Sequence, residues 1–411
     1  MNPTATRTRT HMRVASLIIM LMTLFLATGC GLLKKPEITG KTSLERLRIT
    51  QYPQFDDSLD YSGLIDGIDG SLEYLNRVPE TREFYVGRDI YTAAHLKKSL
   101  QHFRDRLADS PGRETLNRFI RDDYIVYQSV GRDGRGEMLF TGYYEPTIAG
   151  SLTKLPEYPY PVYARPKDLT TIDLSLFGDE FKGKQIVGRY TGESVVPYYP
   201  RSEIDHTGIL DDRCDILAWV RDPVDLFFLQ IQGSGKIMLA QGGHLNVHYH
   251  VVNGHPYRSI GRMLIDEGKI TKEEMSMQKI RSYLKEHPGE VDRVLNYNPS
   301  YVFFKLEEEG PVGFLQVKLT PVRSIALDRR LFPPAALAFI ETERPELDHY
   351  GEIFEWRDLK AFVLNQDTGG AIRGPGRADL FWGNGHYAEV AAGYMQHPGR
   401  LYFLVLKPDI E

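Results

Sequence analysis

The stretch "QDTGGAIRGPGRADLFWGNG" (366–385) holds two aspartates, Asp367 and Asp379, twelve positions apart around four glycines and a proline. Each glycine inside a helix costs about 1 kcal/mol relative to alanine, so the stretch is not expected to be helical. The segments "AFVLNQD" (361–367) and "ADLFWG" (378–383) on either side have the composition of strands. The pattern therefore predicts a strand, a glycine-rich turn and a second strand, with both carboxylates at the same end of a sheet.

Aromatic residues next to Asp379 suggest a chemical role for it. Phe381 and Trp382 follow it closely, and a carboxyl group walled by apolar rings has its ionised form disfavoured, so its pKa rises. Such a carboxyl group can act as a general acid near neutral pH. The residues also allow a plainer interpretation, in which Asp367 caps the turn and Arg377 pairs with Asp379.

Composition limits the classes of protein to which the chain can belong. Its 411 residues predict two or three structural units, and 42% hydrophobic with 26% charged residues is typical of a folded protein. The formal net charge of -5 gives no reason to expect nucleic-acid binding. The two cysteines, Cys30 and Cys214, exclude a disulfide framework and a cysteine-rich metal site.

The N-terminus has the pattern of an export signal. A basic segment precedes the apolar run at 14–28, which suits a signal peptide because a membrane-spanning helix needs roughly 20 apolar residues. Cys30 directly after this run resembles a bacterial lipobox, although Ala27 stands where that pattern prefers leucine. We expect a signal peptide at 1–29, a lipid on Cys30 and, because Gly31 is not an aspartate, anchoring to the outer membrane facing the periplasm. An ordinary signal peptide with an incidental cysteine is the alternative.

Local patterns along the chain predict a mainly β protein with helices. Residues 30–59 are polar and aperiodic and are predicted to be a linker. The segment 93–108 has the apolar spacing of a helix, and a second helix is expected in 271–289, capped by Thr271. Between 138 and about 250, short apolar runs separated by glycine and proline, including "DLFFLQIQG" (225–233), indicate a β-barrel or sandwich.

Six sequence blocks occur in an order that resembles a known family. Besides the opening stretch they are "FTGYYEP" (140–146), "DLFFLQIQGSG" (225–235), "NGHPYRSIGRMLIDEG" (253–268), "NPSYVFF" (298–304) and "SIALDRRLFPP" (324–334). Together they resemble the membrane-bound lytic murein transglycosylase A family, with its C-terminal 3D domain, over about 135–411. The resemblance implies a double-psi β-barrel domain at 60–146 and 306–411, interrupted by a smaller β-barrel domain at 147–305. Substrate glycan is then expected in a groove between them.

The family's three aspartates fall on Asp328, Asp367 and Asp379, and the last matches the single catalytic acid/base. The resemblance implies that the following residues bind substrate: Thr141, Tyr143, Tyr144, Gln230, Gln232, Ser234 and Gly370. In a strand the two tyrosines point to opposite faces, so one is expected to stack on sugar and the other to belong to the core. The amides of 230 and 232 and the hydroxyl of 234 could instead be polar groups at a strand end. Two departures stand out. Ala335 replaces a glycine that the family often has, and the charged stretch 341–358 between Asp328 and Asp367 resembles a loop insertion, which weakens the role assigned to Asp328.

The resemblance implies a peptidoglycan lytic exotransglycosylase, a carbon–oxygen lyase. Such an enzyme cleaves the β-1,4 bond between N-acetylmuramic acid and N-acetylglucosamine without water and leaves a 1,6-anhydro sugar. One carboxyl group suffices, because the sugar's own C6 hydroxyl is the nucleophile. Two rival functions remain: a peptidoglycan hydrolase with two carboxylates, and a lipoprotein that binds murein without cleaving it.

Other motifs were weighed as binding sites. "QGSGKI" (232–237) lacks the spacing and the hydroxyl of a phosphate-binding loop. The histidines at 244, 248, 250 and 255 could form a metal site, but no cysteine or helical H-E-x-x-H pattern accompanies them. We expect no metal and no cofactor, glycan strands as the substrate, a monomer by default, and association with the murein synthesis machinery. The sequence does not separate action at strand ends from action within strands.

Overall fold

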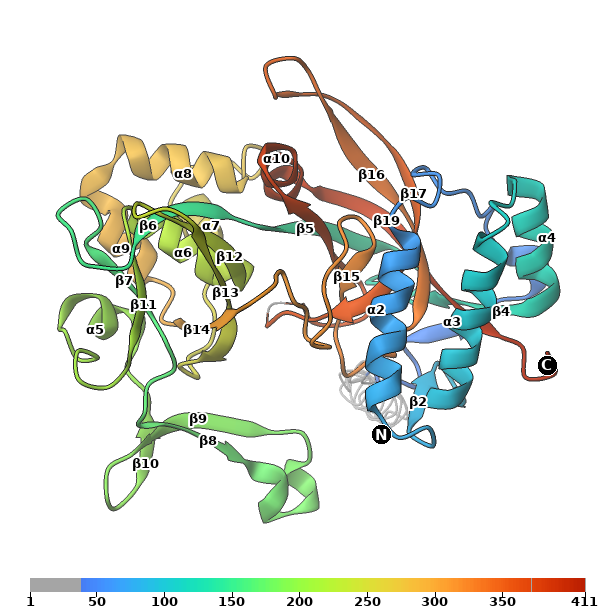
Figure 1. The fold of residues 1–411 in the computed structure, drawn as a ribbon, viewed down its shortest axis with the longest axis horizontal. Helices are drawn as coiled ribbons and strands as arrows, with labels where there is room; N and C mark the ends of the chain where they lie inside the picture. Colours follow the sequence, from blue (N-terminus) through green and yellow to red (C-terminus); the bar gives the residue numbers. More distant parts are fainter. Residues whose placement is uncertain (1–37, 371, 411) are drawn as a thin grey trace, which may run out of the picture. The chain divides into compact units, whose positions relative to one another are not determined.

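The computed structural model describes residues 38–370 and 372–410 of the chain. Contacts divide the chain into two units, 1–38 and 39–411, and the second unit contains the strands and helices of the fold. The predicted signal peptide and Cys30 lie outside the described residues. Strands make up more of the described residues than helices do, and the helices pack against them, as the sequence predicts (Figure 1).

One sheet closes into a barrel that carries the predicted aspartates. Its strands pair in the order β19-β16-β17-β15-β18-β5, and β5 pairs again with β19, so that six strands form a closed ring. We call this ring the first barrel, and β4 and β1 extend its sheet beyond β19. The strands are β1 (Leu44–Arg46), β4 (Tyr124–Ser129), β5 (Met138–Glu145), β15 (Ser324–Ala326), β16 (Leu337–Leu347), β17 (Ile353–Asp367), β18 (Arg377–Asn384) and β19 (Gln396–Leu406).

A second barrel is inserted between β5 and β15. Its sheet has the order β14-β13-β12-β6-β11-β7, and a bridge between Ala164 and Phe304 joins the two edges. The strands are β6 (Thr147–Ser151), β7 (Tyr160–Tyr163), β11 (Ile216–Val220), β12 (Ser234–Leu239), β13 (His244–Val252) and β14 (Val302–Glu307). A separate three-stranded sheet leaves this region and consists of β8 (Leu169–Asp173), β9 (Gln185–Tyr190) and β10 (Val195–Pro197) (Figure 1).

Helices cover both barrels with apolar faces. The first barrel packs against α2 (Leu64–Arg77), α3 (Ala93–Leu107), α4 (Arg113–Asp123) and α10 (His386–Tyr394). The second barrel is accompanied by α5 (Arg201–His206), α6 (Pro223–Gln232), α7 (Ile260–Asp266), α8 (Met277–Glu286) and α9 (Val291–Asn296). A short hairpin, β2 (Glu83–Val86) and β3 (Asp89–Thr92), precedes α3, and single 3-10 turns lie at η1 (Ile49–Gln51), η2 (Leu174–Phe177), η3 (Asp179–Phe181) and η4 (Pro288–Glu290).

The helix expected around 93–108 is confirmed, whereas a predicted strand is wrong. Thr92 caps α3 by accepting a hydrogen bond from the His95 N–H at 3.2 Å. The run "DLFFLQIQG" belongs to helix α6, not to a strand. Asp222 caps this helix, Pro223 opens it and Gly233 ends it at a φ of 84°. Because α6 is buried on most sides, its apolar run lacks the period that separates a helix from a strand.

Three further expectations need correction. Thr271 and Glu274 do bond each other, but they close a turn, and α8 begins later with Ser276 as its cap. The expected linker is partly folded, since β1 pairs with β4 and Phe55 is buried in the core. The stretch 341–358 is not a loop, because β16 and β17 pair along it as a long hairpin.

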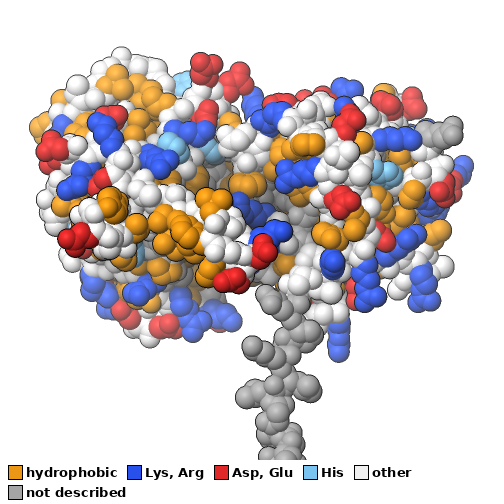
Figure 2. Space-filling model, turned by 90° about the horizontal axis from the view of Figure 1, so that it is seen from below, with side chains coloured by type: hydrophobic (Ala, Val, Ile, Leu, Met, Phe, Trp, Pro, Cys, Tyr) orange, Lys and Arg blue, Asp and Glu red, His pale blue; other side chains and the backbone are white. Residues whose placement is uncertain are grey.

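Two segments project from the barrels and end in exposed apolar side chains. The tip of the β16–β17 hairpin carries Tyr350 and Phe354, and the turn after β8 carries Leu176 and Phe177 (Figure 1). Figure 2 shows acidic and basic side chains mixed across one face of the molecule. That face therefore has no broad field of a single sign to steer a charged partner.

Candidate active site

The glycine-rich turn places the two aspartates on either side of one short strand. β17 ends at Asp367, and Asp379 lies near the start of β18, as predicted. The sequence did not reveal that β15 lies between them, with Ala326 paired to Asp367 on one side and to Asp379 on the other. With a strand spacing of about 4.8 Å, the two Cα atoms are roughly 10 Å apart. Thr141 on β5 is the next partner of Asp379 across the sheet.

Asp379 is held by side chains of its own strand and of β5. Thr141 donates a hydrogen bond to its Oδ1, and Arg377 donates from Nε to Oδ1 at 3.0 Å and from Nη2 to Oδ2 at 3.4 Å. The pairing with Arg377 that the sequence left open is therefore present. The expected aromatic wall is only partly there, because Trp382 points into the core of the first barrel while Phe381 stands beside Tyr143.

Asp367 is the aspartate whose neutral form is favoured. Burial raises its pKa to about 6 from 3.8, partly offset by hydrogen bonds from the Thr368 N–H, the Phe314 N–H and the Tyr143 hydroxyl, while the charge of Asp379 raises it further. These donors lie 2.8 to 2.9 Å from the carboxylate oxygens. Burial and the neighbouring Asp367 also raise the pKa of Tyr143 well above its usual value, so Tyr143 remains a donor.

Asp328 is buried and binds the glycine-rich turn. Arg330 donates to both of its oxygens at 2.9 and 2.7 Å, and the Gly374 N–H donates at 3.0 Å. Burial raises its pKa, but the hydrogen bonds from Arg330 and Gly374 outweigh this, so the pKa is lowered overall. With 0% of its side chain exposed, Asp328 fixes the turn that separates the other two aspartates.

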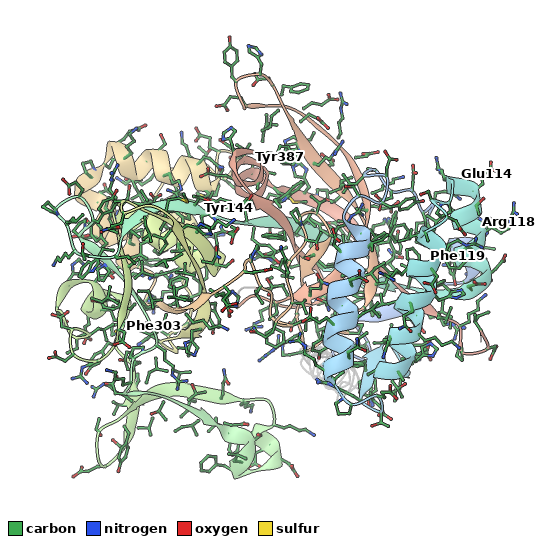
Figure 3. All side chains as sticks on the ribbon, in the orientation of Figure 1. Glu114, Arg118, Phe119, Tyr144, Phe303 and Tyr387 are labelled. Atoms are coloured by element: carbon green, nitrogen blue, oxygen red, sulfur yellow. The ribbon has the colours of Figure 1, made fainter. Side chains whose placement is uncertain are left out.

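The substrate-binding residues expected from the sequence fall into separate groups. Thr141 and Tyr143 contact the two aspartates, whereas Tyr144 points to the opposite face and donates to Glu389 on α10 at 3.3 Å (Figure 3). Gln232 accepts a bond from the Tyr144 N–H at 3.1 Å.

The other three residues expected to bind substrate, Gln230, Ser234 and Gly370, do not line one common groove. Gln230 is buried in α6 and accepts a bond from Arg201, so it serves the packing of the second barrel. Ser234 begins β12 beside His248, and Gly370 is exposed in the glycine-rich turn. The structure therefore brings Thr141 and Tyr143 to the aspartates and leaves Gln230 away from solvent.

The alternative sites proposed from motifs gain no support. "QGSGKI" follows a helix and enters a strand, the reverse of the order in a phosphate-binding loop. Among residues 38–370 and 372–410, no group of three His, Cys, Asp or Glu side chains is placed to hold a metal ion. Burial, with the charge of Lys305, lowers the pKa of His248 to about 4, and His255 bonds the Tyr198 carbonyl at 2.7 Å.

Three residues around the site carry no signal in the sequence. Phe314 donates its backbone N–H to Asp367, and the Arg329 guanidinium lies 5.0 Å from the centre of the Phe314 ring. Tyr257, from the segment after β13, lies close enough to Arg377 for that charge to lower its pKa in part against the effect of burial. No local pattern marks Phe314, since it acts through its backbone.

Two protein families match the chain, one in the inserted part and one towards the C-terminus. A family described as "MltA specific insert domain" matches residues 139–305, and the "3D domain" family matches residues 323–405. Membrane-bound lytic murein transglycosylase A of Escherichia coli K12 is 37% identical over 286 residues, which cover 69% of this chain and 70% of that protein. This chain belongs to the membrane-bound lytic murein transglycosylase A family. It is thus a peptidoglycan-cleaving lyase.

Solved structures of the family share this fold. The membrane-bound lytic murein transglycosylase of Agrobacterium tumefaciens superposes with a TM-score of 0.72 at 30% identity, covering 89% of this chain and 98% of that chain. The Escherichia coli enzyme with bound chitohexaose superposes with a TM-score of 0.69 at 26% identity, covering 91% and 97%. The fold and family expected from the sequence are confirmed. The double-psi connection stays an expectation consistent with the closed barrel.

The names of the relatives also bear on location. They are called membrane-bound, which suggests that this family associates with a membrane. Within the part of the chain that the structure describes, no helix is both long and apolar enough to span a bilayer. Cys214 is buried with a free thiol, in line with the sequence.

Proposed function

We propose that this enzyme cleaves the β-1,4 bond between N-acetylmuramic acid and N-acetylglucosamine and leaves a 1,6-anhydromuramic acid end, with Asp379 as its single acid/base. Membership of the family supports the lytic reaction. The glycan held by the chitohexaose-bound relative supports a carbohydrate substrate. The reaction needs two proton transfers, one to the glycosidic oxygen and one from the C6 hydroxyl, and Asp379 can carry out both.

The carboxyl group of Asp379 gives one proton and takes one proton back in each reaction cycle. Protonated Asp379 gives its proton to the glycosidic oxygen as the C1–O bond breaks, and the N-acetylglucosamine end leaves as an alcohol. The resulting carboxylate takes the proton of the C6 hydroxyl, whose oxygen bonds to C1 and closes the anhydro ring. No water enters, and the carboxyl group returns to its protonated form. The Thr141 hydroxyl holds the carboxyl group in place through its bond to Oδ1.

The choice of Asp379 rests on how the three aspartates are held. Backbone N–H groups fix Asp367 and Asp328, from Phe314 and Thr368 in the first case and from Gly374 in the second. Among the described residues, the hydrogen bonds to the Asp379 carboxylate come from side chains alone, and its side chain is 16% exposed. Side-chain partners can turn away when a sugar arrives, whereas backbone donors cannot. Asp379 is therefore the carboxyl group that can pass a proton to substrate.

We assign supporting roles to the remaining predicted residues. Asp367 and Tyr143 set the charge and hydrogen bonding beside Asp379, and Asp328 holds the glycine-rich turn. We keep the domain division predicted from the sequence, 60–146 with 306–411 and 147–305, and propose a glycan path between the two parts. The effect of the Arg377 charge on the pKa of Tyr257, which belongs to the inserted part, supports this path. Lipidation at Cys30, anchoring to the outer membrane, a monomeric state and association with murein synthesis proteins remain predictions.

A two-carboxylate hydrolase is the second candidate. The raised pKa of Asp367, about 6, lets this carboxyl group carry a proton below pH 6 beside the carboxyl group of Asp379, and a hydrolase uses two carboxyl groups in this way. The way Asp367 is held argues against this candidate. Two of its three donors are backbone N–H groups, from Phe314 and Thr368, which cannot turn away to admit a sugar, whereas the donors to Asp379 are side chains.

Product analysis separates the candidates. Residues 31–411 and the Asp379→Ala variant would be incubated with purified murein sacculi, and the released fragments weighed by mass spectrometry. We expect wild-type fragments lighter than hydrolytic ones by one water, and none from the variant. Hydrated fragments would establish the hydrolase. Binding to sacculi without release, unchanged in the variant, would establish a murein-binding lipoprotein.

A further inference from the structure

The ion pair between Arg377 and Asp379 occupies the atoms that the reaction needs. The guanidinium spans both oxygens of the carboxylate, at 3.0 and 3.4 Å, and Nη2 also donates to Thr141 at 3.3 Å. One of those two oxygens must carry the proton and pass it to the glycosidic oxygen, and the guanidinium favours the ionised carboxylate instead. The pair therefore has to open before Asp379 can act, and the site must supply Arg377 with another acceptor.

We propose that Arg377 exchanges Asp379 for the lactyl group of the N-acetylmuramic acid residue at the cleavage position. This inference rests on the function proposed above and names the side chain that distinguishes muramic acid from glucosamine. Muramic acid differs from glucosamine by a lactyl ether on O3, which ends in a carboxylate or, when a peptide stem is attached, in an amide carbonyl. Both ends accept N–H bonds from a guanidinium, and the carboxylate can do so with two parallel bonds.

The position of Arg377 allows this exchange. It is the first residue of β18, directly after the glycine-rich turn, and 35% of its side chain is exposed. Arg377 and Asp379 are two residues apart and so lie on the same face of the strand. A sugar whose C1 lies at Asp379 thus has the substituents of its own ring within the range of a long arginine side chain.

The surroundings of Arg377 also suit a sugar. Tyr257, in the segment after β13, is 44% exposed, and the charge of Arg377 lowers its pKa slightly against the larger effect of burial. An exposed tyrosine ring offers an apolar face and a hydroxyl, the combination that packs on one side of a pyranose. Tyr257 would then offer the sugar ring an apolar surface in the neighbourhood of Arg377.

The exchange makes the enzyme specific for muramic acid in two ways. Arg377 strengthens binding of the muramic sugar, and the same step frees Asp379 from its ion pair. A chito-oligosaccharide has a free hydroxyl at O3 and offers Arg377 no anionic acceptor, so the ion pair to Asp379 stays closed. A muramic acid residue opens it. Arg377 is thus a specificity-determining residue, and its effect should depend on which glycan is bound.

The test measures the affinity of two glycans for non-cleaving protein. Asp379→Asn and the double variant Asp379→Asn/Arg377→Gln would be titrated by calorimetry with a muramic-acid-containing tetrasaccharide and with chitohexaose. We expect Arg377→Gln to weaken the muramic glycan about tenfold or more, as for loss of a charge-assisted bond, and to change chitohexaose less than twofold. Equal losses for both glycans, or no loss for either, would overturn the inference.

A matched control is offered by the hairpin. Arg357 pairs with Glu355 two residues away on β17, at 3.1 and 2.9 Å, far along the strand from Asp367. Arg357→Gln in the Asp379→Asn protein removes the same charge and should leave both affinities unchanged. Arg377→Lys should recover part of the muramic affinity, because it keeps the charge but not the paired bonds.

Failure of the proposed function gives a different result. If the Asp379→Asn protein bound neither glycan, or if wild-type protein released no anhydro products from sacculi, the function itself would be wrong. If both glycans bound and wild-type products carried anhydro ends, while Arg377→Gln did not discriminate between the glycans, only the role of Arg377 would be wrong.

Discussion

Two arginine–aspartate ion pairs in this enzyme have different roles, one in the stability of the fold and the other in the active site. Arg323 and Asp57 are 0% and 1% exposed, with Nη1–Oδ2 at 2.7 Å and Nη2–Oδ1 at 2.9 Å. Two further N–H groups of Arg323 donate to the carbonyls of Ser62 and Phe362, at 2.8 and 2.9 Å. This pair ties the segment before α2 to the first barrel, and four of the five N–H groups of the guanidinium have acceptors in the protein.

The pair in the site is held far less completely. Arg377 and Asp379 are 35% and 16% exposed, and one of their two bonds is long at 3.4 Å. A buried pair with further backbone partners cannot rearrange without leaving a charge uncompensated, whereas a partly exposed pair can exchange its partners with substrate. The two ion pairs therefore differ in how many further hydrogen bonds hold them and in how much solvent reaches them. Substitutions in each pair test this comparison.

The largest effect is expected when the buried pair is broken. Asp57→Ala leaves the Arg323 guanidinium buried without its counter-charge, which should lower the free energy of unfolding by about 3–5 kcal/mol. Urea unfolding at pH 7 measures this. The neighbouring Asp56, which is 48% exposed and 3.8 Å from Arg113, provides the control, since Asp56→Ala should cost less than about 0.5 kcal/mol. Similar losses for both variants would contradict the comparison.

Asp367→Asn should stabilise the protein, and more so as the pH rises. With a pKa of about 6 in the folded protein against 3.8, Asp367 destabilises the fold progressively as the pH rises from 3.8 to 6, and the full cost remains above pH 6. Below pH 3.8 the group is neutral in both the folded and unfolded states. The variant should therefore gain up to about 3 kcal/mol relative to wild type between pH 4 and pH 7. Thermal unfolding across this range measures the gain, and a gain that shrinks with rising pH would contradict the assignment.

Asp328→Asn should loosen the glycine-rich turn. It removes the charge that Arg330 and the Gly374 N–H both bind, and the expected loss of stability is about 1–2 kcal/mol. Hydrogen exchange at Gly374 should accelerate. Since the pKa of Asp328 is lowered on folding, the difference from wild type should fade as the pH drops through its folded pKa. Unchanged exchange at Gly374 would remove Asp328 from this role.

The smallest change in stability is expected at the site pair. Arg377→Gln breaks a partly exposed ion pair, so the free energy of unfolding should fall by less than about 1 kcal/mol. Turnover on muramic glycan should nevertheless be reduced, because the variant lacks the side chain proposed to bind the lactyl group. Urea unfolding beside Asp57→Ala gives the comparison directly. A loss near that of Asp57→Ala would mean that Arg377 is a structural residue.

Much of the site was predictable because its signals are local. Glycines at 369, 370, 374 and 376 exclude a helix and fix the turn between β17 and β18, so the two aspartates were placed correctly at strand ends. The apolar spacing in α3 likewise lies on one face with a cap in front of it. In such places neighbouring residues determine the structure.

The rest depends on contacts between distant segments. Nothing near Asp57 indicates Arg323, which is 266 positions away, so the segment around Asp57 was predicted to be a linker. The insertion of β15 between the aspartates is a property of the closed barrel. Phe314 acts through its backbone N–H, which every residue type except proline provides. The apolar run of α6 could equally be a buried strand until its neighbours are known.

The most direct test of the account compares turnover of Asp379→Asn with that of Asp367→Asn on purified murein glycan strands at pH 6 to 7. If Asp379 is the single acid/base, its asparagine variant should lose turnover by about 10³-fold or more, while Asp367→Asn keeps at least a tenth of the wild-type rate and still yields anhydro ends. Equal losses in both variants, with hydrated products from wild type, would contradict the single-carboxyl mechanism and establish a pair of catalytic carboxylates.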